Sequence, residues 1–360
     1  MGMVPLVEPH AALSERERLR TARHARLPQL GEIGQRRLAG AHIAIVGAGG
    51  LGAPLVLALA AAGVGTLTVI DDDVVELSNL HRQVIHRLRD VGSPKVASAA
   101  RVAAELSETR VVPLERRLTP ANTADALRGA HLVIDGSDSF ETRAMVAGAC
   151  EQLGVPLVWG TIQAFDAQVT VFWNAPPPGV APVVLADLHP PESVGELPSC
   201  AQVGVMGALC LQVGSLMALE AIKLVTGVGE SLLGRVLVID GLRATQREVR
   251  LTAARALPHE APARAREVLA DALAGTSVLD VRESDEVASG MIPGARHVPL
   301  ARVLADPGAA AGGDAPTVVV CHSGARAHQA AAAMRAAGVD AVVLAGGMLA
   351  WRAALQDASA

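Results

Sequence analysis

Residues 41–83 decide the fold, with the sequence AHIAIVGAGGLGAPLVLALAAAGVGTLTVIDDDVVELSNLHRQ. Ile43–Val46 is a short apolar run, typical of a strand buried on both faces. A glycine-rich turn follows, and then an Ala- and Leu-rich stretch, Ala53–Ala62, predicts a helix. Thr66–Ile70 predicts a second strand, and Asp71 comes directly after it. A strand, glycines, a helix, a strand and an acid in this order indicate a nucleotide site.

The side chains after this unit favour a nucleoside triphosphate. The glycines let the backbone approach a phosphate, and Asp71 is placed to bind a ribose hydroxyl. Asn79, Arg82 and Gln83 follow, and Lys95 opens the next predicted helix. Converging cations suit a triphosphate whose pyrophosphate leaves, whereas a dinucleotide dehydrogenase needs little positive charge here. The alternative is that Arg82 and Lys95 are ordinary solvated charges.

Three motifs carry a family resemblance: GAGGLG (47–52), DDDVVELSNLHRQ (71–83) and PKV (94–96). Together they resemble the MoeB/ThiF family of ubiquitin-activating-type adenylyltransferases, from about Leu27 to Leu251. The resemblance implies ATP and Mg²⁺ as cofactors, and adenylation of the C-terminal Gly-Gly carboxylate of a small ubiquitin-fold sulfur-carrier protein. Because a carboxylate is already an anionic nucleophile, the enzyme needs positioning and charge neutralisation rather than a general base. The implied ATP contacts are Gly50, Asp71, Ser78, Asn79, Leu80, His81, Arg82, Gln83 and Lys95, with Arg82 also catalytic.

Three further residues predicted at the nucleotide site lie outside these motifs. The Arg-rich segment Ser14–Arg26 predicts a helix, whose charges could be a solvated face. The resemblance implies that Arg23 reaches the ATP of a partner subunit, and therefore a homodimer. Asp138 follows the predicted strand His131–Ile134, and the resemblance implies that Asp138 holds Mg²⁺ on the ATP phosphates, with Ser139 beside it where relatives commonly have Asn. An aspartate after a strand is also a common helix N-cap.

Composition limits the class of protein. The chain has 360 residues, of which 51% are hydrophobic and 19% charged, which excludes global disorder. A net charge of −5 argues against a nucleic-acid partner, and no uninterrupted apolar run or signal-peptide layout indicates a membrane. No two cysteines form a C-x-x-C pair, which fits a reduced compartment. We therefore expect a cytoplasmic protein.

The cysteines divide into core and functional candidates. The resemblance implies that relatives commonly hold zinc with a C-x-x-C pair in the loop at 174–200 and a second pair near the end of the domain. Neither pair is present in this sequence, which resembles a zinc-less MoeZ-type subgroup. We therefore expect no zinc. Cys200 precedes a predicted apolar helix at 205–226, and the resemblance makes it catalytic, with a buried packing cysteine as the alternative. Cys150 and Cys210 lie among apolar residues and are assigned to the core.

A second α/β unit follows an Ala-, Pro- and Arg-rich stretch. We expect an adenylating domain at 1–255, a linker at 256–267 and a sulfur-transfer domain at 268–360. The second domain contains VLDVRE (278–283), GMIPGARHVPL (290–300) and CHSGAR (321–326), which together resemble a rhodanese (sulfurtransferase) domain. The expected fold class is therefore α/β, with a Rossmann-like adenylating domain built on a mostly parallel sheet and a smaller rhodanese-like domain.

The CHSGAR loop carries the chemistry of the second domain. Cys321 lies between a buried strand and a helix, where backbone N–H groups and Arg326 stabilise a thiolate or persulfide. A Cys-based phosphatase has five residues between its cysteine and arginine, whereas this loop has four, His322–Ala325, which favours a single sulfur atom. We expect a persulfide donor such as a cysteine desulfurase, or thiosulfate.

The two domains together predict one reaction sequence. ATP activates the carrier carboxylate, the Cys321 persulfide attacks the acyl adenylate, and by resemblance Cys200 cleaves the acyl disulfide to release the thiocarboxylate. Two alternatives from other classes stay open. An NAD-type redox enzyme does not account for the cations or the second domain, and a non-catalytic scaffold does not account for Cys200, Cys321 and Arg326.

Overall fold

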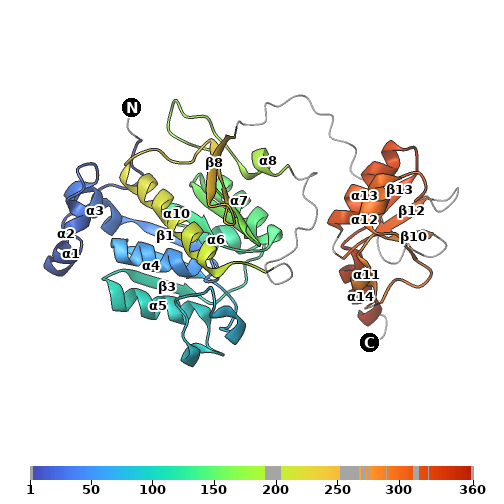
Figure 1. Ribbon diagram of the computed structural model, residues 1–360, viewed down its shortest axis with the longest axis horizontal. Helices are drawn as coiled ribbons and strands as arrows, with labels where there is room; N and C mark the ends of the chain where they lie inside the picture. Colours follow the sequence, from blue (N-terminus) through green and yellow to red (C-terminus); the bar gives the residue numbers. More distant parts are fainter. Residues whose placement is uncertain are drawn as a thin grey trace. The chain divides into compact units, whose positions relative to one another are not determined.

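The computed structural model describes residues 3–190, 204–251, 267–268, 273, 276–288, 290–310, 316–322 and 324–357. These residues form two compact units, the first comprising most of 3–251 and the second most of 267–357 (Figure 1).

The first unit is an α/β domain. Its helices are α1 (Glu15–Arg20), α2 (Ala22–Ala25), α3 (Gly31–Gly40), α4 (Gly52–Ala62), α5 (Lys95–Leu106), α6 (Thr123–Leu127), α7 (Phe140–Leu153), α8 (Leu185–Leu188) and α10 (Gly207–Thr226). Its strands are β1 (His42–Val46), β2 (Thr66–Ile70), β3 (Arg110–Leu114), β4 (Leu132–Asp135), β5 (Leu157–Gln163), β6 (Asp166–Phe172), β7 (Arg235–Asp240) and β8 (Thr245–Arg250). Short 3₁₀ turns are Leu77–Asn79 and Leu88–Asp90.

The strands form one mixed sheet in the order β3-β2-β1-β4-β5-β6-β7-β8. The pairs from β3 to β5 are parallel, and those from β5 to β8 are antiparallel. Because α4 and α5 cross over between parallel strands, the carboxyl ends of β1, β2 and β4 lie at one edge of the sheet. This edge is where an open α/β sheet binds ligands.

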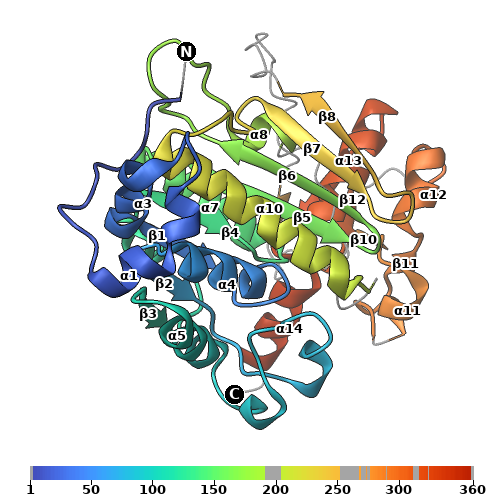
Figure 2. The same cartoon turned by 60° about the vertical axis from the view of Figure 1, so that its left-hand side comes forward.

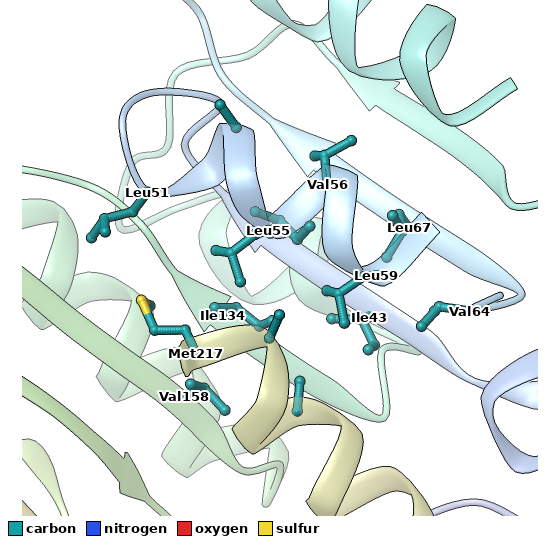
Figure 3. Packing of buried hydrophobic residues seen from close by; sticks show 14 of the residues in the cluster. Ile43, Leu51, Leu55, Val56, Leu59, Val64, Leu67, Ile134, Val158 and Met217 are labelled. Carbon is teal, nitrogen blue, oxygen red and sulfur yellow. The ribbon is translucent and has the colours of Figure 1, made fainter. Parts of the chain in front are cut away.

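Both faces of the sheet are covered, which explains the continuous apolar strands. Ile43 and Ile45 pack with α4, α5 and α10 on one face, whereas Ala44 and Val46 pack with α6 and α7 on the other. Figure 2 shows α4 and α10 on the same side of the sheet. Figure 3 shows the first of these clusters, where Met217 of α10 lies beside the residues of α4 and the central strands.

Helix α10 is the one described helix long and apolar enough to cross a membrane by length and composition. Its charged residues Glu220 and Lys223 pair with each other near its C-terminal end. Leu209, Val213 and Met217 are buried against α4 and the sheet, as expected of a core helix. Burial in the core therefore accounts for its apolar composition.

The second unit has a five-stranded parallel sheet in the order β11-β10-β12-β13-β9. Apolar residues cover both faces in two clusters, one with α12 and α13 and one with α14. Its strands are β9 (Glu267–Val268), β10 (Ser277–Asp280), β11 (Arg296–His297), β12 (Thr317–Val320) and β13 (Ala341–Leu344). Its helices are α11 (Ser284–Val287), α12 (Leu300–Ala305), α13 (Ala325–Ala336) and α14 (Gly347–Asp357).

The predicted fold class is confirmed, with differences in individual elements. Strand β3 ends at Leu114, and the residues after it line a cavity. The helix predicted at 14–26 is divided at Thr21, whose hydroxyl donates to the Glu17 carbonyl at 2.7 Å. Strand β5 runs to Gln163 and forms a hairpin with β6.

Candidate nucleotide and sulfur sites

A cavity of about 450 Å³ lies at the carboxyl ends of β1, β2 and β4. It is lined by the glycine turn, the segment after β2, the start of α5, the residues after β3 and the β4–α7 loop. Seven of the predicted nucleotide residues line it: Gly50, Asp71, Arg82, Gln83, Lys95, Asp138 and Ser139. The fold therefore brings together residues from four separate segments of the sequence.

The glycine turn is close-packed. Gly47 has φ +89°, a conformation that side chains rarely adopt, and a Cβ on Gly52 would lie 1.9 Å from the Gly47 carbonyl oxygen. A Cβ on Gly50 would lie 3.1 Å from the Cys210 sulfur and 3.5 Å from the Arg82 Cδ. The glycines therefore permit a turn whose backbone stays open to a phosphate at the beginning of α4.

Asp71 is fixed in place by backbone donors. Its carboxylate accepts hydrogen bonds from Ala48 N–H at 2.7 Å and Asp73 N–H at 2.9 Å. Burial raises the pKa of Asp71, while the positive charge of Lys95 acts in the opposite direction. This carboxylate thus links the glycine turn to the end of β2, where the ribose was predicted.

The predicted cations have different environments. Lys95 is buried and pairs with Asp73 at 2.7 Å, a partner that the sequence did not reveal. Arg82 extends over Gly50, and its Nη1 donates to the Ser78 carbonyl at 3.1 Å and to His81 Nε2 at 2.7 Å. Both cations line the cavity.

Sequence reasoning missed two arginines of this cavity. Arg116 and Arg117 follow β3, are exposed and also line it. They belong to the ligand-binding edge of the sheet because β3 ends at Leu114, and no local pattern in the sequence marks that end.

The β4–α7 loop is held from both sides. Asp135, fully buried, accepts a hydrogen bond from Ser137 N–H at 2.9 Å, and burial raises its pKa. Arg143 donates to the Ser137 carbonyl at 3.0 and 3.3 Å, and its guanidinium lies 5.5 Å from the Trp159 ring centre. Sequence reasoning missed this support for the Asp138 loop.

Ser139, not Asp138, caps α7. The Ser139 hydroxyl accepts a hydrogen bond from Thr142 N–H at 3.0 Å. Because the serine provides the cap, the Asp138 carboxylate is exposed at the wall of the cavity, where the Mg²⁺ role was predicted.

Five of the predicted contacts do not line the cavity: Arg23, Ser78, Asn79, Leu80 and His81. The Asn79 side chain accepts a hydrogen bond from Glu76 N–H at 3.1 Å, and Ser78 Oγ donates to Glu76 at 3.1 Å. These bonds shape the turn before Arg82. Arg23 is exposed on α2, and its reach into a partner subunit stays a prediction.

The sulfur loop of the second unit surrounds Cys321. The thiol is fully buried, and Gly324, at φ +120°, donates its N–H to the sulfur at 3.1 Å. Met348 N–H donates to the Cys321 carbonyl at 2.9 Å, and a Cβ on Gly347 would lie 2.5 Å from that same oxygen. The beginnings of α13 and α14 thus both pack against this loop.

The predicted cation of this loop is paired with a carboxylate. Arg326 donates to both oxygens of Glu286, at 2.6 and 2.7 Å. These hydrogen bonds lower the pKa of Glu286 to about 2. Arg282 and Asp280 form a second, buried ion pair at 2.6 Å. The sequence indicated Arg326 but not its partner, which comes from a different strand–helix connection.

Two predictions about cysteine and metal fall largely outside the described residues. Cys200 lies in the segment 191–203, which the structure does not describe, so its catalytic role and the absence of zinc stay predictions. Cys150 and Cys210 are buried, as predicted, although Cys210 also touches the cavity. Within the described part of the chain, no group of three or more His, Cys, Asp or Glu side chains suits a metal ion.

Comparison with known proteins agrees with the two predicted domain types. The ThiF family model matches residues 21–258, and the model of the rhodanese-like domain matches residues 265–354. The chain belongs to the ThiF family. A probable adenylyltransferase/sulfurtransferase MoeZ of Mycobacterium tuberculosis is 41% identical, over 99% of this chain and 98% of that protein. This likeness over the full length confirms the predicted resemblance to MoeZ-type enzymes.

Further relatives match a shorter part of the chain. A sulfur carrier protein adenylyltransferase of Thermus thermophilus is 46% identical over 62% of this chain and 83% of that protein. The crystal structure of E. coli MccB matches 66% of this chain and 71% of its own with a TM-score of 0.57 and 19% identity, a likeness of fold.

Proposed function

We propose that this ThiF-family chain adenylates the C-terminal carboxylate of a ubiquitin-fold sulfur-carrier protein and then transfers sulfur to it from a Cys321 persulfide. The main support for the first step is the cavity, which is lined by the glycine turn, Arg82 and Lys95. A sulfur loop on the same chain, with a buried thiol and an N–H donor aimed at it, supports the second step.

In the first step a carrier carboxylate oxygen attacks the α-phosphorus of ATP, and the bond to the pyrophosphate breaks. Arg82 and Lys95 offset the charge that develops on the leaving pyrophosphate, and Asp71 orients the ribose. Asp138 is the residue that would hold Mg²⁺, since its carboxylate faces the cavity and carboxylates are ligands that Mg²⁺ prefers. The bound ion would neutralise phosphate charge.

In the second step the terminal sulfur of the Cys321 persulfide attacks the acyl adenylate and AMP leaves, forming an acyl disulfide. Cys200 then attacks this disulfide, which releases the thiocarboxylate and leaves a disulfide that a reductant must open. The sulfur donor is a persulfide-bearing protein such as a cysteine desulfurase, or thiosulfate. We also propose a cytoplasmic homodimer in which Arg23 of each subunit serves the partner's ATP.

The test is carrier-dependent exchange of labelled pyrophosphate into ATP, with candidate carriers captured on the Cys321→Ala protein and identified by their Gly-Gly ends. We expect exchange only when both ATP and a Gly-Gly carrier are present. Tight binding of NAD, with no exchange for any captured carrier, would overturn the proposal in favour of a redox enzyme.

A further inference from the structure

The charge of the residues around the sulfur loop affects which sulfur donor can react with Cys321. Of the residues from Cys321 to Arg326, the arginine alone carries a fixed positive charge. It is the second residue of α13, the helix that begins directly after Gly324, whose N–H contacts the Cys321 sulfur. A sulfur-donating anion that reaches Cys321 therefore approaches the first turn of this helix.

Glu286 binds the Arg326 guanidinium with both of its carboxylate oxygens. Both its oxygens accept hydrogen bonds from the guanidinium, and the two side chains are only 11% and 30% exposed. Glu286 Oε2 also accepts a hydrogen bond from Glu283 N–H at 2.9 Å, which fixes the carboxylate at the beginning of α11. Since the pKa of Glu286 is about 2, the carboxylate stays charged at any working pH. The pair thus contributes no net charge.

The neighbouring arginine, Arg282, is also paired with a carboxylate. Arg282 donates to both Asp280 oxygens and to the carbonyls of Glu286 and Gly290. In the described part of the second unit, the ion pairs Arg282–Asp280 and Arg326–Glu286 therefore each carry no net charge.

Donors differ in the charge that they bring. With thiosulfate, the Cys321 thiolate attacks the outer sulfur, the sulfur–sulfur bond breaks, and sulfite leaves with the electron pair. Three negative charges then meet at the loop. With a persulfide, the thiolate attacks the terminal sulfur and the donor thiolate leaves, so at most two charges meet. An unpaired guanidinium would favour the thiosulfate reaction more strongly, because charge interactions grow with the charge of the donor.

We propose that Glu286 is a specificity-determining residue which, by neutralising Arg326, makes Cys321 selective for persulfide donors over the thiosulfate dianion. This inference rests on the proposed sulfur transfer. Glu286 acts through Arg326 rather than by touching the reacting sulfur.

The test measures single-turnover loading of Cys321 in the full chain by intact mass, with thiosulfate and with cysteine persulfide. Glu286→Gln retains an oxygen acceptor for Glu283 N–H but removes the charge. We expect its loading rate from thiosulfate to rise on the order of tenfold, and to fall again with added salt, since the gain is electrostatic. Loading from cysteine persulfide should change less than twofold.

Three companion variants separate charge from structure. Arg326→Gln leaves Glu286 uncompensated and should slow thiosulfate loading, whereas the Glu286→Gln and Arg326→Gln double variant restores neutrality and should return near the wild-type rate. Glu283→Gln removes the carboxylate of the N-cap residue of α11 but retains an oxygen acceptor for the Glu286 N–H, so its donor preference should be unchanged.

Two results are decisive against the inference. A Glu286→Gln protein with an unaltered ratio of thiosulfate to persulfide loading, or one that loses both equally, shows that the pair is only structural. Loading of the wild type from neither donor would instead contradict the proposed function itself.

Discussion

At the scale of single residues, hydrogen bonds within the protein hold the side chains of the nucleotide site in place. Arg82 is held over Gly50 by its bonds to the Ser78 carbonyl and His81, and Asp71 is held by two backbone N–H groups. Side chains fixed in this way need little reorganisation when charge develops on a leaving group. We therefore expect the effect of their removal to fall on the rate of adenylation.

Arg82→Ala should reduce pyrophosphate exchange by about 10²–10³-fold, or roughly 2.7–4 kcal/mol, the cost of losing one preorganised charge-stabilising donor. Arg89→Ala is the matched control, because Arg89 lies in the same segment, is 68% exposed and does not line the cavity. It should retain wild-type exchange. Equal activity of the two variants would remove Arg82 from the catalytic groups.

Residues close in sequence could be predicted, and partners distant in sequence could not. Asp71, Gly50 and Arg82 belong to one continuous motif, so their spacing placed them in the cavity. The pairs Asp73–Lys95 and Glu286–Arg326 join different connections of the fold. No local pattern marks such a pair, because it forms only when the strands have taken their order in the sheet.

At the scale of elements, the β1–α4 turn demands glycine at the first residue of the helix. Gly52→Ala should destabilise the protein by about 1–3 kcal/mol, since its Cβ overlaps the Gly47 carbonyl, and should abolish ATP binding by opening the turn. Gly148→Ala is the control within α7, where a Cβ meets nothing within 4 Å. It should stabilise by about 0.5–1 kcal/mol.

Thermal unfolding and ATP titration calorimetry check both glycine variants. The opposite signs of the two changes are the essential result. A Gly52→Ala protein that binds ATP normally would show that the turn relaxes without opening, and that close packing at Gly47 has no part in the site.

Strongly apolar elements were predicted within about a residue, as with β2 and α4. Two ends were not. The charged residues after Leu114 follow the strand directly, and no glycine or proline comes after it until Pro120. The β5–β6 hairpin turns at Ala164, which has φ +53°, a conformation that sequence patterns assign to glycine or asparagine. Packing, not local preference, sets both boundaries.

At the scale of the whole molecule, the sequence predicts a protein without structural zinc. The four cysteines cannot supply paired tetrahedral sulfur ligands at the usual spacing. Metal analysis of protein purified without chelators should therefore find less than one zinc per chain. Stoichiometric zinc that resists dialysis would mean that the segment 191–203 holds a metal site of another kind.

We expect substitutions to affect adenylation and sulfur transfer separately. The nucleotide cavity lies on the sheet of the first unit, whereas Cys321 lies on the sheet of the second. Cys321→Ala should retain pyrophosphate exchange and lose sulfur loading, since no residue of the nucleotide cavity is altered. Cys200→Ala should form the adenylate, load Cys321 and then stall, with the carrier joined to Cys321 as an acyl disulfide that a reductant releases.

Intact-mass measurement of Cys200→Ala with ATP, carrier and sulfur donor, before and after reductant, detects this adduct. Cys150→Ala is the control, because Cys150 is a buried thiol of α7 whose loss affects packing alone. It should turn over without a trapped species. If Cys200→Ala makes thiocarboxylate at the wild-type rate and no reducible adduct accumulates, Cys200 is not needed to cleave the acyl disulfide. An external thiol must then cleave the acyl disulfide, and it would form a mixed disulfide with Cys321.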